Sequence, residues 1–117
     1  MPPAPESLLP LSPPVFHILL SLADADRHGY AIMQDVAFRT DGRLRLSPGT
    51  LYGSIKRLLE DGFIEELSER PDPEDDDTRR RYYRITPRGR KVAIEESTRL
   101  AKLLRQARAT GLAPKTV

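Results

Sequence analysis

The chain contains no cysteine, no tryptophan and no apolar run long enough to cross a bilayer. Without cysteine it cannot form a disulfide or a thiolate metal site. A membrane-spanning helix would need about 20 mostly apolar residues in a row. The first residues, Met-Pro-Pro-Ala-Pro-Glu, also lack the basic and apolar regions of a signal peptide. We therefore expect a cytoplasmic protein that does not bind a membrane.

The residue combinations that support catalysis or hold a metal are missing as well. The sequence has no glycine-rich phosphate loop and no nucleophile grouped with a histidine and an orienting acid. The acidic run from Asp72 to Asp77 lacks the sixth-position glycine and the twelfth-position glutamate of a calcium-binding loop. The two histidines, His17 and His28, are expected to be structural. The sequence thus predicts no catalytic residue, no metal, no cofactor and no enzymatic activity.

Charge is plentiful but unevenly placed. The 117 residues include 19 basic and 17 acidic side chains, so the formal net charge is only +2. The acidic run is followed directly by a basic block: Arg79, Arg80, Arg81 and Arg84. Neighbouring blocks of opposite sign create strong local fields although the total nearly cancels. A charged partner is therefore expected, unless the adjacent acids neutralise the arginines.

The stretch from Leu46 to Gly62 carries the signals of a short helix at both ends. Ser47 is suited to cap the first amide groups, and Pro48 to occupy the first helical position. Gly62 can end the helix, because glycine adopts the left-handed conformation without a Cβ clash. The larger apolar side chains share one face: Leu51, Ile55 and Leu58. The opposite face and its flanks are polar, small or basic: Thr50, Tyr52, Gly53, Ser54, Lys56 and Arg57.

The elements after this helix follow the order of a known domain type. Residues 63–67 are a strand candidate, residues 68–78 a polar, turn-rich loop, and residues 79–85 a second strand. A cap-and-proline pair at Thr86 then opens a long helix over about residues 87–109. Helix, strand, loop, basic strand and helix is the order of a winged helix-turn-helix domain. The predicted fold is mainly α with a small β-hairpin.

Two further helices are expected earlier, over about residues 13–25 and 29–39, with a polar turn between them. The apolar residues of the first cover about 200° of its circumference, and only His17 and Ser21 lie opposite. In the second helix four residues are expected to face inward: Tyr30, Met33, Val36 and Ala37. Alternation in the second strand turns two residues inward, Tyr83 and Ile85, and two toward solvent or a ligand, Tyr82 and Arg84.

Composition and periodicity divide the chain into four parts. Residues 1–11 hold four prolines without periodicity, which indicates a flexible N-terminal arm. Residues 12–86 form the winged domain, which has the mass for a single modest core. Residues 87–110 form a C-terminal dimerisation helix, and residues 111–117 a flexible tail.

The last helix is too long for the small domain that precedes it, so we expect it to pair with a second copy of the chain. The expected interface lies on this helix and the first one: Phe16, Leu20, Val92, Glu96, Leu100, Leu103, Leu104 and Ala107. Burial of the three leucines of the last helix, Leu100, Leu103 and Leu104, would contribute roughly 5–9 kcal/mol before entropy. Glu96 is the polar exception. Either it reaches solvent at the edge of the interface, or it pairs across the dimer with His17 or an arginine.

Several runs of the sequence resemble one family of bacterial regulators. They are Leu46-Ser-Pro-Gly-Thr-Leu-Tyr-Gly-Ser-Ile-Lys-Arg-Leu58, Asp61-Gly-Phe-Ile64, Arg80-Arg-Tyr-Tyr-Arg-Ile-Thr-Pro-Arg-Gly89 and His28-Gly-Tyr-Ala-Ile32. Over about residues 12–110 the chain resembles the PadR family, in its compact form with a single short C-terminal helix. The resemblance implies a homodimeric winged-helix repressor that controls its own gene or a neighbouring one.

With this resemblance, the outer face of the 47–61 helix becomes the DNA-reading surface and the basic strand a phosphate-binding wing. The predicted contacts are Ser47, Thr50, Tyr52, Gly53, Ser54, Lys56, Arg57, Arg79, Arg80, Arg81 and Arg84. Tyr52 is equally suited to a phosphate contact and to partial core packing. The acidic wing tip departs from the short, basic tips of the family, because it would repel phosphates.

The predicted function is sequence-specific regulation of transcription, with double-stranded DNA bound at a palindromic operator by a homodimer. A solvated helix face is the simpler interpretation of Lys56 and Arg57 taken alone. A winged-helix module that binds only protein is the alternative function. The sequence does not identify the operator, the regulated gene or a small-molecule effector.

Overall fold

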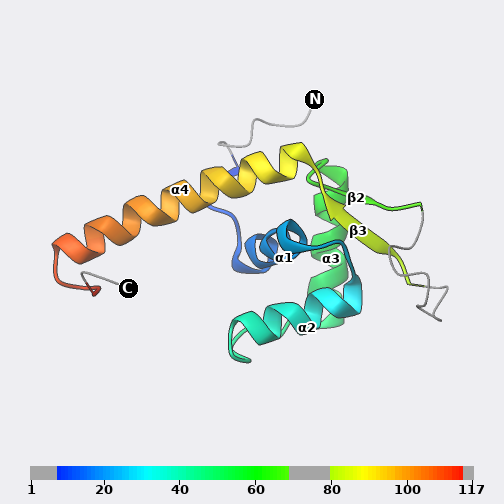
Figure 1. Cartoon of the computed structure of the whole chain (residues 1–117), viewed down its shortest axis with the longest axis horizontal. Helices are drawn as coiled ribbons and strands as arrows, with labels where there is room; N and C mark the ends of the chain where they lie inside the picture. Colours follow the sequence, from blue (N-terminus) through cyan, green and yellow to red (C-terminus); the bar gives the residue numbers. More distant parts are fainter. Residues whose placement is uncertain (1–7, 69–79, 115–117) are drawn as a thin grey trace.

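The computed structural model describes residues 8–68 and 80–114, which form a helical body with a small sheet on one side (Figure 1). The elements in chain order are α1 (Pro13–Asp24), β1 (Arg27–His28), α2 (Gly29–Arg39), α3 (Pro48–Glu60), β2 (Ile64–Glu66), β3 (Tyr82–Ile85) and α4 (Pro87–Ala109). Residues 1–7, 69–79 and 115–117 lie outside the described residues. The four helices of the described chain lie where the sequence predicts them. None of these helices has the length and apolarity that a bilayer crossing requires.

Three helices begin with the same capping device. The side-chain oxygens of Ser12, Ser47 and Thr86 each accept a hydrogen bond from the backbone N–H three residues ahead, and a proline follows each cap. α2 differs, because Nδ1 of His28 accepts from a first-turn N–H at 3.1 Å. Beyond the end of α3, Gly62 has a φ of 76°, the left-handed conformation that the sequence predicts there.

Within the described residues, the sheet has three antiparallel strands in the order β1-β3-β2, one more than the predicted hairpin. The extra strand falls in the expected polar turn, because two residues are too few to show a periodicity. It overturns the prediction for Tyr82, which lies opposite His28 and is buried rather than turned to solvent. The two rings meet edge to face with 5.2 Å between their centroids. Tyr83 and Ile85 are buried as predicted.

The core lies where α1 packs against α2, α3, β3 and α4. Because α1 is covered on so many sides, Ser21 is fully buried, although the sequence places it opposite the apolar face. In α2 the buried stripe is rotated from the predicted one. Tyr30 is 54% exposed and Ile32 is buried instead, since α2 turns the bare backbone of Gly29 toward α3. The core draws on every one of these elements: Ile18, Leu19, Ile32, Val36, Leu51, Leu58, Phe63, Ile85 and Val92.

The sequence predicts a flexible arm and a flexible tail, but described residues at both ends of the chain make contacts. Residues 8–11 contribute leucine side chains that pack against the core. The backbone N–H of Leu11 donates to Oε2 of Glu96 on α4 at 3.1 Å. At the other end, residues 111–114 close the helix, because the N–H of Leu112 donates to a carbonyl oxygen of the last turn of α4 at 2.8 Å. Residues 8–11 are thus held against the body, whereas the flexible tail stays a prediction.

α4 starts against the sheet and projects beyond the body along its far half (Figure 1). Gly89 fixes the start, because a Cβ there would overlap the carbonyl oxygen of Phe63. Three leucines of the far half are exposed: Leu100, Leu103 and Leu104. The far half thus presents an apolar stripe that its own chain leaves uncovered.

Candidate nucleic-acid interface

α3 presents the surface that the sequence singles out. Its apolar face is buried in the core through Leu51, Ile55 and Leu58. The opposite side is open to solvent and is made of predicted contact residues: Thr50, Tyr52, Gly53, Lys56 and Arg57, with Ser54 half-buried at its flank. No residue of the described ranges forms an ion pair with Lys56 or Arg57. The side chains of Lys56 and Arg57 are therefore available to bind a ligand.

Two predicted contact residues, Ser47 and Gly53, have different roles in the fold. Oγ of Ser47 accepts from the N–H of Thr50 at 3.2 Å and donates to the Thr50 hydroxyl at 3.1 Å, so the cap already uses it. Gly53 and Gly49, one turn apart, have nothing within 4 Å of the place where a Cβ would stand. The described body therefore does not require glycine at either position, and the surface there is flat and open.

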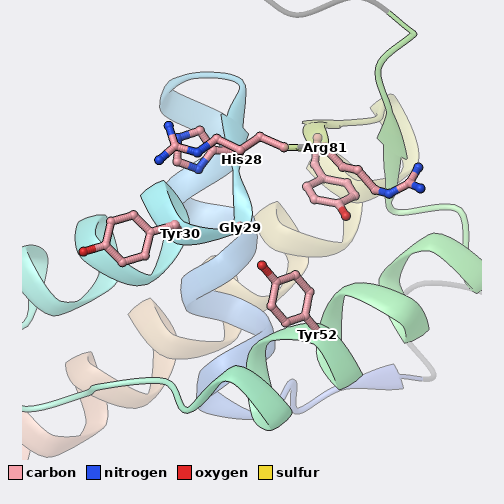
Figure 2. A pocket seen from close by; sticks show the side chains of 7 residues that line it. His28, Gly29, Tyr30, Tyr52 and Arg81 are labelled. Carbon is pink, nitrogen blue, oxygen red and sulfur yellow. The ribbon is translucent and has the colours of Figure 1, made fainter. Parts of the chain in front are cut away.

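A hollow of about 540 Å³ joins α3 to the base of the wing (Figure 2). Its lining comes from the start of α2, from α3 and from the chain around β3: His28, Gly29, Tyr30, Tyr52, Arg80, Arg81 and Tyr83. The structure thus brings together three predicted contact residues, Tyr52, Arg80 and Arg81. Two further parts of the lining are not predicted contacts. One is Tyr83, which alternation alone assigns to the core, and the other is the start of α2. The only signal for the latter in the sequence is the resemblance of the run that begins at His28.

The arginines of the basic block have different surroundings. Arg81 donates to Oε2 of Glu66, on the neighbouring strand, at 3.0 Å. Arg84 pairs with Asp26 at 2.8 Å, and this hydrogen-bonded carboxylate raises the pKa of the Arg84 guanidinium. Arg84 lines a separate hollow between the end of α1 and the start of α4. Arg79 and the acidic tip lie outside the described residues. The structure thus places Arg81, but not Arg84, beside α3.

The residues predicted to form a dimer interface fall into two groups. Six keep exposed surface in the single chain: Phe16, Leu20, Leu100, Leu103, Leu104 and Ala107. Val92 and Glu96 do not, because they are 0% and 2% exposed. The body and the N-terminal segment already cover their part of α4, so the structure makes these two residues part of the core. Further exposed apolar side chains lie outside the predicted interface: Phe38, Ile94 and Leu112.

Glu96 is held within its own chain. Its carboxylate accepts hydrogen bonds from the Arg99 guanidinium and from the N–H of Leu11. The Arg99 hydrogen bond, opposed by burial, lowers the pKa of Glu96. The interpretation that Glu96 reaches solvent is therefore wrong, because the side chain is 2% exposed. Pairing across a dimer stays a prediction, although partners within the chain already bind the carboxylate. The sequence does not indicate the contact with Leu11, because residue 11 falls in the predicted flexible arm.

Known proteins share this sequence pattern and this fold. A family model described as Transcriptional regulator PadR-like family matches residues 18–95. The transcriptional regulator Rv3488 of Mycobacterium tuberculosis is 38% identical over 90 residues, which cover 77% of this chain and 78% of that protein. An uncharacterized protein from a Streptomyces fradiae transposon is 35% identical over 86 residues, which cover 74% of this chain but only 22% of that protein.

A solved structure shows the same architecture. The PadR family transcription regulator from Clostridium difficile matches with a TM-score of 0.70 over 85% of this chain and 98% of that one. The identity is 20%, so this likeness concerns the fold. The predicted winged-helix fold is confirmed. Because the family model covers more than half of the sequence, the chain belongs to the PadR-like family of DNA-binding transcriptional regulators.

Proposed function

We propose that this protein is a repressor that binds a palindromic operator as a homodimer, with α3 in the major groove. The observation that carries the proposal is the outer face of α3, which is exposed, flat at Gly53 and basic at Lys56 and Arg57. Helices of this kind read base edges and phosphates from the major groove. Elsewhere on the body, Arg39 and Arg84 pair with carboxylates, whereas the two cations of α3 have no such partner among the described residues.

The homodimer is supported by the exposed stripe on the far half of α4. Burial of Leu100, Leu103 and Leu104 against a second copy would contribute roughly 5–9 kcal/mol before entropy. Leu20 of α1 is also exposed and would extend the same interface. A symmetric dimer presents α3 twice, so the operator is expected to hold two half-sites about 34 Å apart, one turn of DNA.

Fluorescence anisotropy with a salt titration tests the proposal on a duplex selected from a random-sequence pool. Lys56→Ala and Arg57→Ala are expected to weaken binding by about 1–3 kcal/mol where the side chain reaches a base edge. Where it binds a phosphate instead, the salt slope falls by about one. Lys91→Ala removes an exposed cation of α4 and is the matched control. Unchanged affinity in both α3 variants would rule out α3 as the reading helix.

One observation favours a second candidate, a winged helix that binds only protein. Arg81 and Arg84 are already paired with Glu66 and Asp26, which reduces the positive charge that the wing offers to DNA. Such a module would keep its fold and its dimer but would not bind any duplex at about 50 mM salt, where phosphate contacts are strong. The same anisotropy measurement therefore separates the two functions.

A further inference from the structure

The hollow beside Tyr52 has features that a reading helix does not require. It lies between α3 and β3 (Figure 2). Its lining includes the first turn of α2, an 11-residue helix whose N-terminal end carries a partial positive charge. Arg80 and Arg81 line it as well. The helix end and the arginines favour an anion there, while Glu66, the partner of Arg81, opposes it in the free protein.

Tyr83 supplies a polar group that the protein leaves unused. Its side chain belongs to the core and is 4% exposed, yet it lines the hollow. No residue of ranges 8–68 and 80–114 forms a hydrogen bond with its hydroxyl. Burial and the nearby Glu66 carboxylate raise the pKa of Tyr83, so the phenol keeps its proton and acts as a donor. The side chain is nearly buried, but its hydroxyl, unpartnered within the described chain, opens onto the hollow, where it can donate to an acceptor that enters from outside.

A second phenol reaches the same hollow from α3. Tyr52 is half exposed, and Figure 2 shows its hydroxyl directed toward Gly29 at the start of α2. A Cβ at Gly29 would come within 2.8 Å of that hydroxyl, so the bare backbone allows Tyr52 to lie there. Tyr52 and Tyr83 both line this hollow. Two hydroxyl donors from different elements therefore line one hollow.

We propose that this hollow seats one phosphodiester of the DNA backbone, with Tyr83 and Tyr52 donating hydrogen bonds to its non-bridging oxygens. The proposal rests on the proposed function and gives Tyr83 a positioning role on DNA. In the free protein Arg81 pairs with Glu66 at 3.0 Å. On DNA the phosphate takes the place of Glu66 as the partner of Arg81, because both groups carry one negative charge. Phosphate contacts of this kind fix the register of a protein on the duplex without reading its sequence. The hollow thereby sets how α3 enters the groove.

Tyr83→Phe in the full chain removes the hydroxyl and keeps both the ring and the charge. We expect binding about tenfold weaker on every duplex, with an unchanged salt slope because no charge is lost. The thermal unfolding midpoint is expected to stay the same, since the hydroxyl bonds no described residue. Ser97→Ala is the control, because it removes an exposed hydroxyl on α4 that does not line the hollow. Wild-type affinity in Tyr83→Phe overturns the proposal.

A methylphosphonate scan of the selected duplex locates the phosphate. Each linkage is replaced in turn by a neutral analogue that lacks one non-bridging acceptor oxygen. At one linkage per half-site, the replacement is expected to weaken binding of the wild type but not of Tyr83→Phe. Such a difference measures an energetic coupling between Tyr83 and that linkage. Equal sensitivity of both proteins at every linkage contradicts the proposal. So does a flat scan together with saturable shifts of the Tyr83 ring resonances by adenosine monophosphate, since the hollow would then hold a free anion.

Glu66→Gln tests the exchange of Arg81. Release of Arg81 is expected to tighten DNA binding about threefold and to steepen its salt dependence. Glu65→Gln is the control, because Glu65 lies opposite Arg84 in the β2–β3 register rather than opposite Tyr83. No change in Glu66→Gln contradicts the exchange.

The outcomes separate the inference from the proposed function. A wild type that binds no duplex removes both. Binding that weakens in Lys56→Ala but not in Tyr83→Phe removes the phosphate seat alone and leaves α3 as the reading helix.

Discussion

The two halves of α4 carry one apolar stripe in two different surroundings. In the first half, Val92 has no exposed surface, and the backbone of Gly89 lies against that of Phe63. In the second half, Leu103 is 52% exposed. The residue pattern does not change between the halves, but the body of the chain reaches only the first. Periodicity therefore identifies which face of a helix is buried, and does not tell which molecule buries it.

A charge marks the boundary between the two halves. Glu96 is the last buried residue of α4, and it is bound both by Arg99 on the same helix and by the backbone of Leu11. The N-terminal segment therefore contacts α4 at the place where the helix leaves the body. This contact helps set the direction of the far half, and with it the position of any second copy that packs there.

The largest effect is expected at the start of α4. Gly89→Ala would place a methyl group on the carbonyl oxygen of Phe63, so the helix would have to move away from the sheet. We expect a loss of about 2–4 kcal/mol in the free energy of unfolding, measured with urea. Gly53→Ala is the matched control, because its Cβ would meet open space. It is expected to be neutral or slightly stabilising. A Gly89→Ala protein as stable as the wild type would contradict the close approach.

The difference between the halves is tested directly by one truncation in each. Val92→Ala is expected to cost about 2 kcal/mol of folding stability at every protein concentration, because it leaves a cavity in the core. Leu103→Ala is expected to loosen the dimer instead, so that its unfolding midpoint depends more strongly on concentration. Sedimentation equilibrium and urea unfolding measure the two effects. A wild type that sediments as a monomer would remove the dimer from the comparison.

The smallest effect is expected at the boundary, and it depends on pH. Because the folded protein lowers the pKa of Glu96, the carboxylate contributes stability above its ordinary value of about 4.5. That contribution is lost as the pH falls through the lower, folded-state pKa. Glu96→Gln is expected to cost about 1 kcal/mol at neutral pH, and this cost is expected to shrink as the pH falls below 4.5. Urea unfolding across this range measures it, with Glu95→Gln as the neighbouring control. Parallel pH profiles for wild type and Glu96→Gln would show that the carboxylate contributes nothing.

The parts of the fold that the sequence predicts are those set by neighbouring residues. The helix starts at Ser12, Ser47 and Thr86 depend on a hydroxyl and the proline that follows it, so they can be read within four residues. Two of the errors involve contacts between distant segments. Tyr82 is buried by β1, and Glu96 is bound by Leu11, and neither contact leaves a local pattern.

The candidate site divides in the same way. The outer face of α3 follows from helical periodicity, and its exposure is as the sequence predicts, while its contacts with DNA stay predictions. The hollow does not follow, because it needs Gly29, Tyr52 and Tyr83 to meet from three separate elements. Alternation in β3 correctly turns Tyr83 inward. It does not show that the hydroxyl at the end of a core side chain reaches a surface.

Gly53 makes α3 less stable but leaves its outer face open to a close approach. A glycine inside a helix costs about 1 kcal/mol relative to alanine, and nothing in the described chain comes within 4 Å of the missing Cβ. The fold alone would therefore favour alanine at this position. A methyl group there would stand on the side of Lys56 and hold the helix off any surface that it approaches. Selection for heat resistance alone is thus expected to substitute Gly53 among the first positions. The resulting helix could no longer approach another surface closely.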